Sequence, residues 1–207
     1  MSWFLIVVVV LIVLIGLWIV FLYNGLIRKR NRVDNAWAQV EVQLKRRHDL
    51  VPNLVATVQG YASHERGTFD SVTQARAAAT SAQGPAQAGA AEGILGQAIG
   101  RLFAVAEAYP ELKANQNFLD LQSQLKDTED KIAISRQVYN DTVLTYNNGI
   151  QTFPAVVFAG MLGFSKRDSF QIDDGDSAVP TVSFTQPADP APAPAPAAET
   201  PGDASGT

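Results

Sequence analysis

The 207-residue sequence contains no cysteine and only two histidines, His48 and His64. The missing thiols exclude disulfide bonds, thiolate catalysis and cysteine metal sites, and they leave the redox compartment undetermined. The formal net charge of −4 is too small to indicate a nucleic-acid partner. No nucleophile elbow, phosphate-binding loop or His-Glu-x-x-His zinc motif occurs. The sequence therefore predicts no catalytic residue, no cofactor and no metal ligand.

The chain opens with a long apolar run. From Trp3 to Tyr23 every residue is apolar or aromatic except Gly16. As a helix, these 21 residues span about 31 Å, which matches the ~30 Å hydrocarbon core of a bilayer. A secretory signal peptide needs a basic start, a shorter apolar stretch and a small-residue cleavage site, and none of these is present. We therefore predict a retained transmembrane helix, with a buried core helix as the alternative.

Charge beside this run predicts its orientation. Directly after it lie four basic residues, Arg28, Lys29, Arg30 and Arg32, whereas the other flank carries only the α-amino group. Because basic residues favour the cytoplasmic side, we expect a single-pass protein of the inner or plasma membrane. Its N-terminus is expected outside, and its remaining residues in the cytoplasm. The basic flank also suits contact with anionic lipid headgroups.

Beyond the anchor, apolar residues recur at alternating spacings of four and three, as on the seam of a helical bundle. The seam of the first soluble helix comprises Val33, Trp37, Val40, Leu44, Arg47, Val51, Leu54, Val58 and Tyr61. The seam of the last helix, over about residues 115–151, comprises Phe118, Leu121, Leu125, Thr128, Ile132, Ser135, Tyr139, Thr142 and Tyr146. These two long helices are predicted to pack antiparallel as the frame of the bundle.

Two shorter helices are predicted between the long ones, over about residues 63–81 and 88–109. Gly84-Pro85 separates the two, and Pro110 ends the second. The fold class is therefore all-α, an N-terminal transmembrane helix followed by an elongated up-and-down four-helix bundle. The expected parts are an anchor at 1–27, the bundle at 28–153, an apolar segment with a short extended piece at 154–184, and a disordered Pro/Ala-rich tail at 185–207.

The limits of the first soluble helix are left open. Pro52 lacks a backbone donor and is expected to kink the helix without necessarily ending it. Its start depends on whether Asn31, Asp34 and Asn35 cap a helix separate from the anchor. At its other end, glycines leave open whether this helix and the next form one long bent helix.

Several stretches resemble the LemA family. They are VDNAWAQVEVQLKRRHDLVPNLVATVQGY at 33–61, AVAEAYPELKANQNFLDLQ at 104–122, TEDKIAISRQVYNDTVLTYN at 128–147 and the Phe153-Pro154 step. The resemblance covers nearly everything from the anchor to Phe184. It implies an N-terminal membrane helix and a soluble four-helix domain of up-and-down type. It implies no site residues, because the family has no established catalytic residues and no settled molecular function.

Arg47 is the one residue that interrupts the apolar seam of the first soluble helix. Its side chain either snorkels to solvent or belongs to a buried polar layer. With the long helices antiparallel, it lies opposite residues 127–135, so we predict an ion pair with Asp127, Glu129 or Asp130. Such a layer fixes helix register more than it adds stability.

Four glycines share one helix face because they are spaced by four, three and four residues: Gly89, Gly93, Gly96 and Gly100. Each costs roughly 1 kcal/mol of helix propensity relative to alanine. One interpretation is a weak, frayed helix start. The other is a smooth surface that a neighbouring helix approaches closely, including a helix of another protomer in a homo-oligomer.

The apolar segment at 154–164 is too short to span a bilayer. It contains Phe158 and Phe164 and is followed by Lys166 and Arg167. Because an antiparallel last helix returns towards the membrane, this segment is predicted to contact the lipid interface. The alternative is that it caps the bundle core.

These features favour a membrane-anchored scaffold or adaptor of the cell envelope that acts through helix surfaces, lipid contacts and self-association. The alternative is an enzyme or metal-dependent site built from dispersed carboxylates with His48 and His64. On a continuous helix those histidines are about 160° apart, so a shared metal needs a bend between them. Asp173, Asp174 and Asp176 are close in sequence, but their loop lacks the other ligands of a calcium site.

Overall fold

The computed structural model describes residues 2–172, and every element in this range is a helix. The elements are α1 (Ser2–Gln59), α2 (Arg66–Ser81), α3 (Gly84–Glu107), α4 (Pro110–Lys113), α5 (Gln116–Gln151) and α6 (Ala155–Ala159). The predicted all-α class is thereby confirmed. The acidic residues from Asp173 on, the expected extended piece at 180–184 and the expected tail at 185–207 lie outside the described residues.

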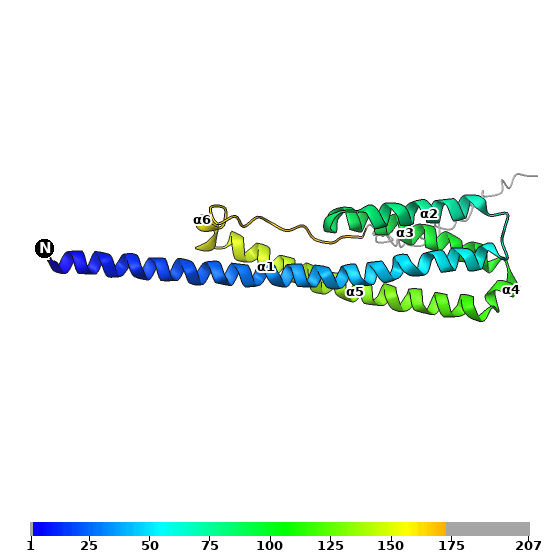
Figure 1. The fold of residues 1–207 in the computed structure, drawn as a ribbon, viewed down its shortest axis with the longest axis horizontal. Coiled ribbons are helices and arrows are strands. Elements are labelled where there is room, and N and C mark those ends of the chain that lie inside the picture. Colours follow the sequence, from blue (N-terminus) through cyan, green and yellow to red (C-terminus); the bar gives the residue numbers. More distant parts are fainter. Residues whose placement is uncertain (1, 173–207) are drawn as a thin grey trace, which may run out of the picture. The chain divides into compact units, whose positions relative to one another are not determined.

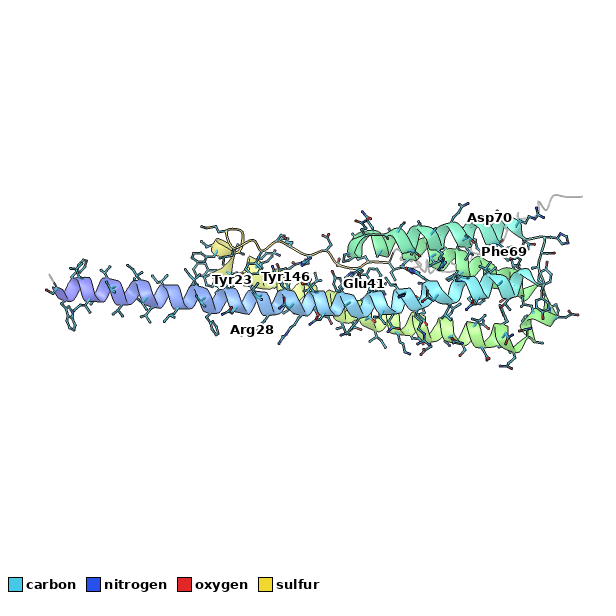
Figure 2. All side chains as sticks on the ribbon, in the orientation of Figure 1. Tyr23, Arg28, Glu41, Phe69, Asp70 and Tyr146 are labelled. Carbon is cyan, nitrogen blue, oxygen red and sulfur yellow. The ribbon has the colours of Figure 1, made fainter. Side chains whose placement is uncertain are left out.

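A single continuous helix, α1, contains both the apolar run and the first bundle helix. Asn31, Asp34 and Asn35 therefore lie inside a helix and do not cap one, and α1 also continues through Pro52 before it ends at Gln59. Its apolar side chains near the N-terminus, from Trp3 to Phe21, are largely exposed. In Figures 1 and 2 the N-terminal turns of α1 extend past the other labelled helices, with side chains projecting on all sides.

The two long helices pack antiparallel, as the seam pattern predicts. The Trp37 ring lies 5.2 Å from the Tyr139 ring, and farther along the pair Arg47 contacts Glu129. Increasing numbers in α1 therefore meet decreasing numbers in α5. On α5, Val143 is buried where the strict four-three alternation expects Thr142. A straight helix has 3.6 residues per turn, so its buried face drifts away from a strict 3.5-residue repeat.

The core consists of two apolar clusters. The first joins α1, from Val51 onwards, to α2, α3, α4 and the start of α5. The second joins α1 between Leu26 and Leu44 to the end of α5, to α6 and to residues up to Phe170. Burial of a large apolar side chain such as Leu54, which is fully enclosed, contributes about 2 kcal/mol.

The buried polar side chains lie between these two clusters. Among the described residues they are Arg47, Glu92 and Thr128. In the second cluster α3 contributes Ala88, near its start, and most of the place of α2 and α3 is taken by α6 and by an extended stretch, residues 164–172, which we call the return segment. Figure 1 shows the return segment running back from α6 along the helices, and Tyr23 and Tyr146 lie at its α6 end (Figure 2).

Candidate functional site

Arg47 lies in a buried layer that ties three helices together. The residue is 6% exposed, so its side chain does not snorkel to solvent. Its Nη1 lies 3.3 Å from Glu92 Oε2 on α3, and its Nη2 lies 3.2 Å from Glu129 Oε2 on α5. The ion pair expected between Arg47 and an acid of α5 is therefore present, with Glu129 as the acid. One guanidinium thus fixes the positions of α1, α3 and α5 relative to one another.

The two other acids considered for this ion pair have different surroundings. Asp127 pairs with Arg46 at 3.6 Å and with Lys131 at 2.8 Å. The hydrogen bond from Lys131 is the main cause of a lowered pKa at Asp127. Asp130 lines a groove beside Arg47. These acids lie on the solvent side of α5, where ion pairs add little stability.

Glu92 is the residue of this layer that the sequence reasoning missed. It is 1% exposed, and it accepts hydrogen bonds from Arg47 and from His48 Nε2, the latter at 2.5 Å. A signal existed in the sequence. Glu92 lies three residues before Leu95 and seven before Ile99, so it continues their apolar stripe backwards. An acid on one stripe and an arginine on another indicate a buried pair.

The glycine face of α3 is used partly within the chain. A Cβ at Gly89 would collide with the backbone carbonyl of Gln171, so the close neighbour there is the return segment and not a helix. At Gly96 a Cβ would lie 3.2 Å from Arg47 Nη2. Gly93 is buried, and a Cβ at Gly100 would meet no atom within 4 Å. All four lie inside α3, which begins at Gly84, so they are not a frayed start.

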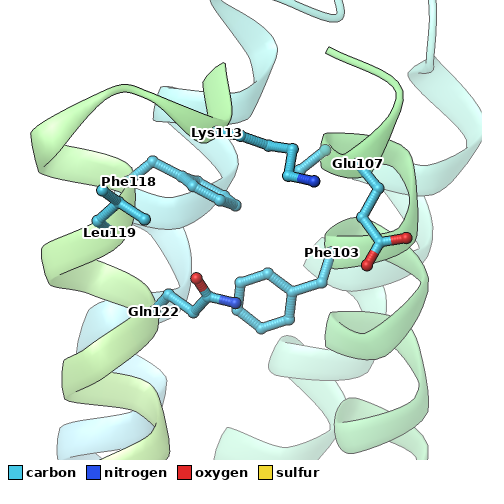
Figure 3. Close-up of a pocket in the computed structure, with 7 residues that line it drawn as sticks. Phe103, Glu107, Lys113, Phe118, Leu119 and Gln122 are labelled. Carbon is cyan, nitrogen blue, oxygen red and sulfur yellow. The ribbon is translucent and has the colours of Figure 1, made fainter. Parts of the chain in front are cut away.

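A groove runs between α3 and α5. Near α4 it is lined by Phe103 and Glu107 of α3 and by Phe118 and Gln122 of α5, which face one another in Figure 3, with Lys113 at its end. Farther along, Arg47 of α1 and Glu129 of α5 line it, and Arg47 contacts both Glu92 of α3 and Glu129. The two helices are therefore joined by side chains across an opening that runs along α3 and α5.

The return segment is held by two asparagines of α5 that lie seven residues apart. Asn140 Nδ2 donates to Phe170 O at 3.0 Å, and Phe170 N donates to Asn140 Oδ1 at 2.9 Å. Asn147 makes the same pair of bonds with Arg167, at 2.9 and 3.0 Å. Each amide thus satisfies the donor and the acceptor of one backbone residue, as a neighbouring β-strand would. The repeated Tyr-Asn pair was the sequence signal for this ladder.

Two tyrosines of α5 complete the ladder. The Tyr139 hydroxyl donates to Asp168 O at 2.8 Å, and the Tyr146 hydroxyl donates to Ser165 O at 2.9 Å. Burial raises the pKa of Tyr139 to about 12, and it also raises the pKa of Tyr146. Both hydroxyls therefore remain protonated donors at neutral pH.

The predicted interface residues gather where α6 meets α1. The Phe158 ring lies 6.3 Å from the Trp18 ring, and the Phe164 ring lies 5.6 Å from the Tyr23 ring. Arg30 lies over the Phe164 ring at 5.8 Å, a cation–π contact.

The basic residues that follow α6 face solvent. Both Lys166 and Arg167 are exposed. Arg167 Nη2 lies 3.0 Å from Asp34 Oδ1 on α1, so its charge is partly neutralised within the chain.

The histidines are not brought together in a site. His48 is bound to Glu92, whereas His64 lies exposed after the end of α1. Within residues 2–172 no three His, Cys, Asp or Glu side chains are grouped as metal ligands would be. The acids and imidazole of the buried layer are engaged by ion pairs and hydrogen bonds inside the protein.

These features together define a class of protein. Of the described helices, α1 alone is long and apolar enough to cross a membrane. It continues without a break into a helical core, so the chain is a membrane-associated helical protein. The sequence profile of the LemA family matches residues 36–184, and the chain belongs to this family.

Curated relatives agree with this assignment. The magnetosome protein MamQ of Magnetospirillum gryphiswaldense is 26% identical over 191 aligned residues, which cover 79% of this chain and 70% of the relative. The magnetosome protein MamQ 1 of Paramagnetospirillum magneticum is similar to the same extent. Protein LemA of Metamycoplasma hominis is 26% identical over 134 residues, which cover 63% of this chain and 60% of the relative.

The buried layer predicts unequal effects for the two acids that share Arg47. Glu92→Ala removes the buried carboxylate that both Arg47 and His48 contact, and should lower the free energy of unfolding by about 3 kcal/mol. Glu129→Ala removes a half-exposed acid, and should cost less than about 1 kcal/mol. Denaturant unfolding of the full chain in detergent measures both. Equal losses would contradict the assignment of Glu92 as the main partner.

The raised pKa of Tyr139 predicts a loss of stability at alkaline pH. Below pH 10 this tyrosine is neutral whether the chain is folded or unfolded, so its contribution is fully present. Between pH 10 and about 12 the Tyr139 hydroxyl loses its proton in the unfolded chain but keeps it in the folded chain. The free energy of unfolding therefore falls by about 2 kcal/mol over this range. Tyr139→Phe should lack this component. Unfolding curves of both proteins across that range test it, and a stability difference that is independent of pH would refute it.

Proposed function

We propose that this protein is a membrane-anchored scaffold with two membrane contacts. The apolar part of α1 spans the bilayer, the helical core lies in the cytoplasm, and α6 makes a second contact with the lipid interface. The contact between Phe158 of α6 and Trp18 of α1 carries this proposal, because Trp18 lies inside the apolar run. An element packed against a transmembrane segment at that level is next to lipid.

The exposed residues around α6 support lipid contact. Phe153 is 83% exposed and Met161 is 85% exposed, and Val156 and Val157 are exposed between them. A contiguous apolar patch is unfavourable in water and typical of a binding surface. The opposite side of α6 packs into the second core cluster through Ala155 and Ala159. The segment therefore caps the core with one face and leaves the other face for lipid.

The charges near α6 support the proposed orientation. Arg28 and Lys166 are exposed on the core side of the apolar run, as expected for a cytoplasmic flank. Such residues contact anionic headgroups when the apolar face of α6 is inserted.

A scaffold role also suits the buried polar layer. Arg47, Glu92 and His48 satisfy one another inside the core, which supports a structural role for them over a catalytic one. The surfaces left for a protein partner or a second copy are the groove between α3 and α5 and the open position at Gly100.

Single-cysteine variants test the two membrane contacts, because the natural chain has no thiol. An environment-sensitive dye on Val157→Cys should report an apolar surrounding in proteoliposomes and be quenched by spin-labelled lipid. The matched control is Ile134→Cys on α5, which is equally exposed in the structure and should report water. Aqueous spectra from both probes would overturn the second contact.

The same approach tests the orientation. Ser169→Cys lies in the return segment and should stay unlabelled by an impermeant maleimide in intact cells, then react after the cells are opened. Labelling in intact cells would place the core outside the cell and contradict the cytoplasmic assignment.

A further inference from the structure

The depth of α6 along α1 follows from its ring contacts. Tyr23 ends the apolar run and contacts Phe164, and Trp18 lies five residues earlier and contacts Phe158. At ~1.5 Å per residue, Trp18 lies about 7.5 Å inside the end of the run. Interfacial helices insert about 5–10 Å into the boundary between headgroups and acyl chains. The exposed face of α6 is thus placed at the depth of an inserted helix and not at the level of the headgroup surface.

The chain is therefore wider in one half of the bilayer than in the other. Next to the core, α1 is accompanied by α6 and the turn after it, because Trp18 contacts Phe158 and Tyr23 contacts Phe164, and Ile19 and Leu22 of α1 are partly buried there. In the other half, side chains such as Val7 and Leu11 are exposed around a single helix. Within residues 2–172, the additional cross-section is contributed by α6 and its flanking loops.

We propose that α6 acts as a one-sided wedge, so that the protein concentrates where the membrane is convex on the side of the core. This inference rests on the proposed second membrane contact and names its partner as the loosely packed interface of a curved lipid surface. An inserted helix adds area to one leaflet only, and that addition is more favourable where curvature has already spread the leaflet.

Two features of α6 fit insertion without a change of fold. The wedge residues Val156, Val157 and Met161 are already exposed, so no core contact is lost when lipid covers them. The inner face is fixed by Ala155, Ala159 and Phe164, which are buried, and by the hydrogen-bonded ladder that holds the return segment. The wedge is thus presented by a rigid support.

Charge makes a separate contribution to membrane binding. Lys166 is exposed and Arg167 is partly neutralised by Asp34, so the basic residues attract anionic lipid whatever its curvature. A test of the wedge must therefore keep lipid composition constant and vary only the vesicle diameter.

The experiment reconstitutes the full chain, carrying Ser169→Cys, at low density into liposomes of one composition and mixed diameter. An impermeant dye added outside labels only the molecules whose core faces outwards, and fluorescence per membrane area is measured on single liposomes. We expect the density of these molecules to rise severalfold from diameters of about 200 nm to about 50 nm. A density that does not depend on diameter would overturn the proposal.

Two triple variants separate the wedge from other causes. Changing Val156, Val157 and Met161 to serine should abolish the dependence on diameter. The matched control changes three residues that are exposed and remote from the anchor to serine: Val42, Ile94 and Ile134. This variant should keep the dependence on diameter. If the triple variant reconstitutes poorly, Met161→Ser alone is measured instead, and it should weaken the dependence on diameter. A dependence that survives in the wedge variants would contradict the role of α6.

Failure of the wedge can be distinguished from failure of the second membrane contact. If the Val157 probe is buried in lipid but density is independent of diameter, the second membrane contact stands and the wedge is refuted. If the Val157 probe reports water, the membrane contact itself fails, and the wedge fails with it.

Discussion

The antiparallel seam between α1 and α5 determines where the other elements of the described chain lie. Its register is fixed by a charged group in an otherwise apolar interface, because Arg47 must meet Glu92 and Glu129 together. A shift of α5 along α1 by one helical turn would bury Arg47 against apolar side chains, at a cost of several kcal/mol. The layer thereby separates two apolar clusters and keeps each opposite its proper partners.

This register has a consequence at the membrane end. α5 returns along α1 until Ile150 joins the cluster that contains Leu26. The chain then turns into α6, and the asparagine ladder holds the return segment against α5. The charged contact of Arg47, which lies 24 residues after Tyr23 at the end of the apolar run, thus helps to set where α6 lies beside Trp18. The proposed membrane contact of α6 therefore depends on the packing of the core.

Much of the fold could be predicted because the long seams are regular. Arg47 stood out as a charge on an apolar stripe, and the antiparallel frame pointed to an acid near Glu129. Glu92 was missed because partners of Arg47 were sought on the last helix, whereas Glu92 lies on α3. The sequence of the return segment shows no hydrophobic periodicity, and its hydrogen bonds come from side chains of α5. The repeated Tyr-Asn pair of α5 was therefore the one sequence signal for it. The continuity of α1 was undecidable because cap residues also occur inside helices.

The claim that α6 lies beside the apolar run of α1 is tested most directly by photo-cross-linking in living cells. Phe158 is replaced by benzoylphenylalanine, an aromatic residue of similar shape, and the cross-linked peptides are identified by mass spectrometry. The structure predicts intramolecular products with the α1 peptide that contains Trp18, since the two rings lie 6.3 Å apart. Products confined to α1 residues beyond Arg32, or to α5, would contradict this placement.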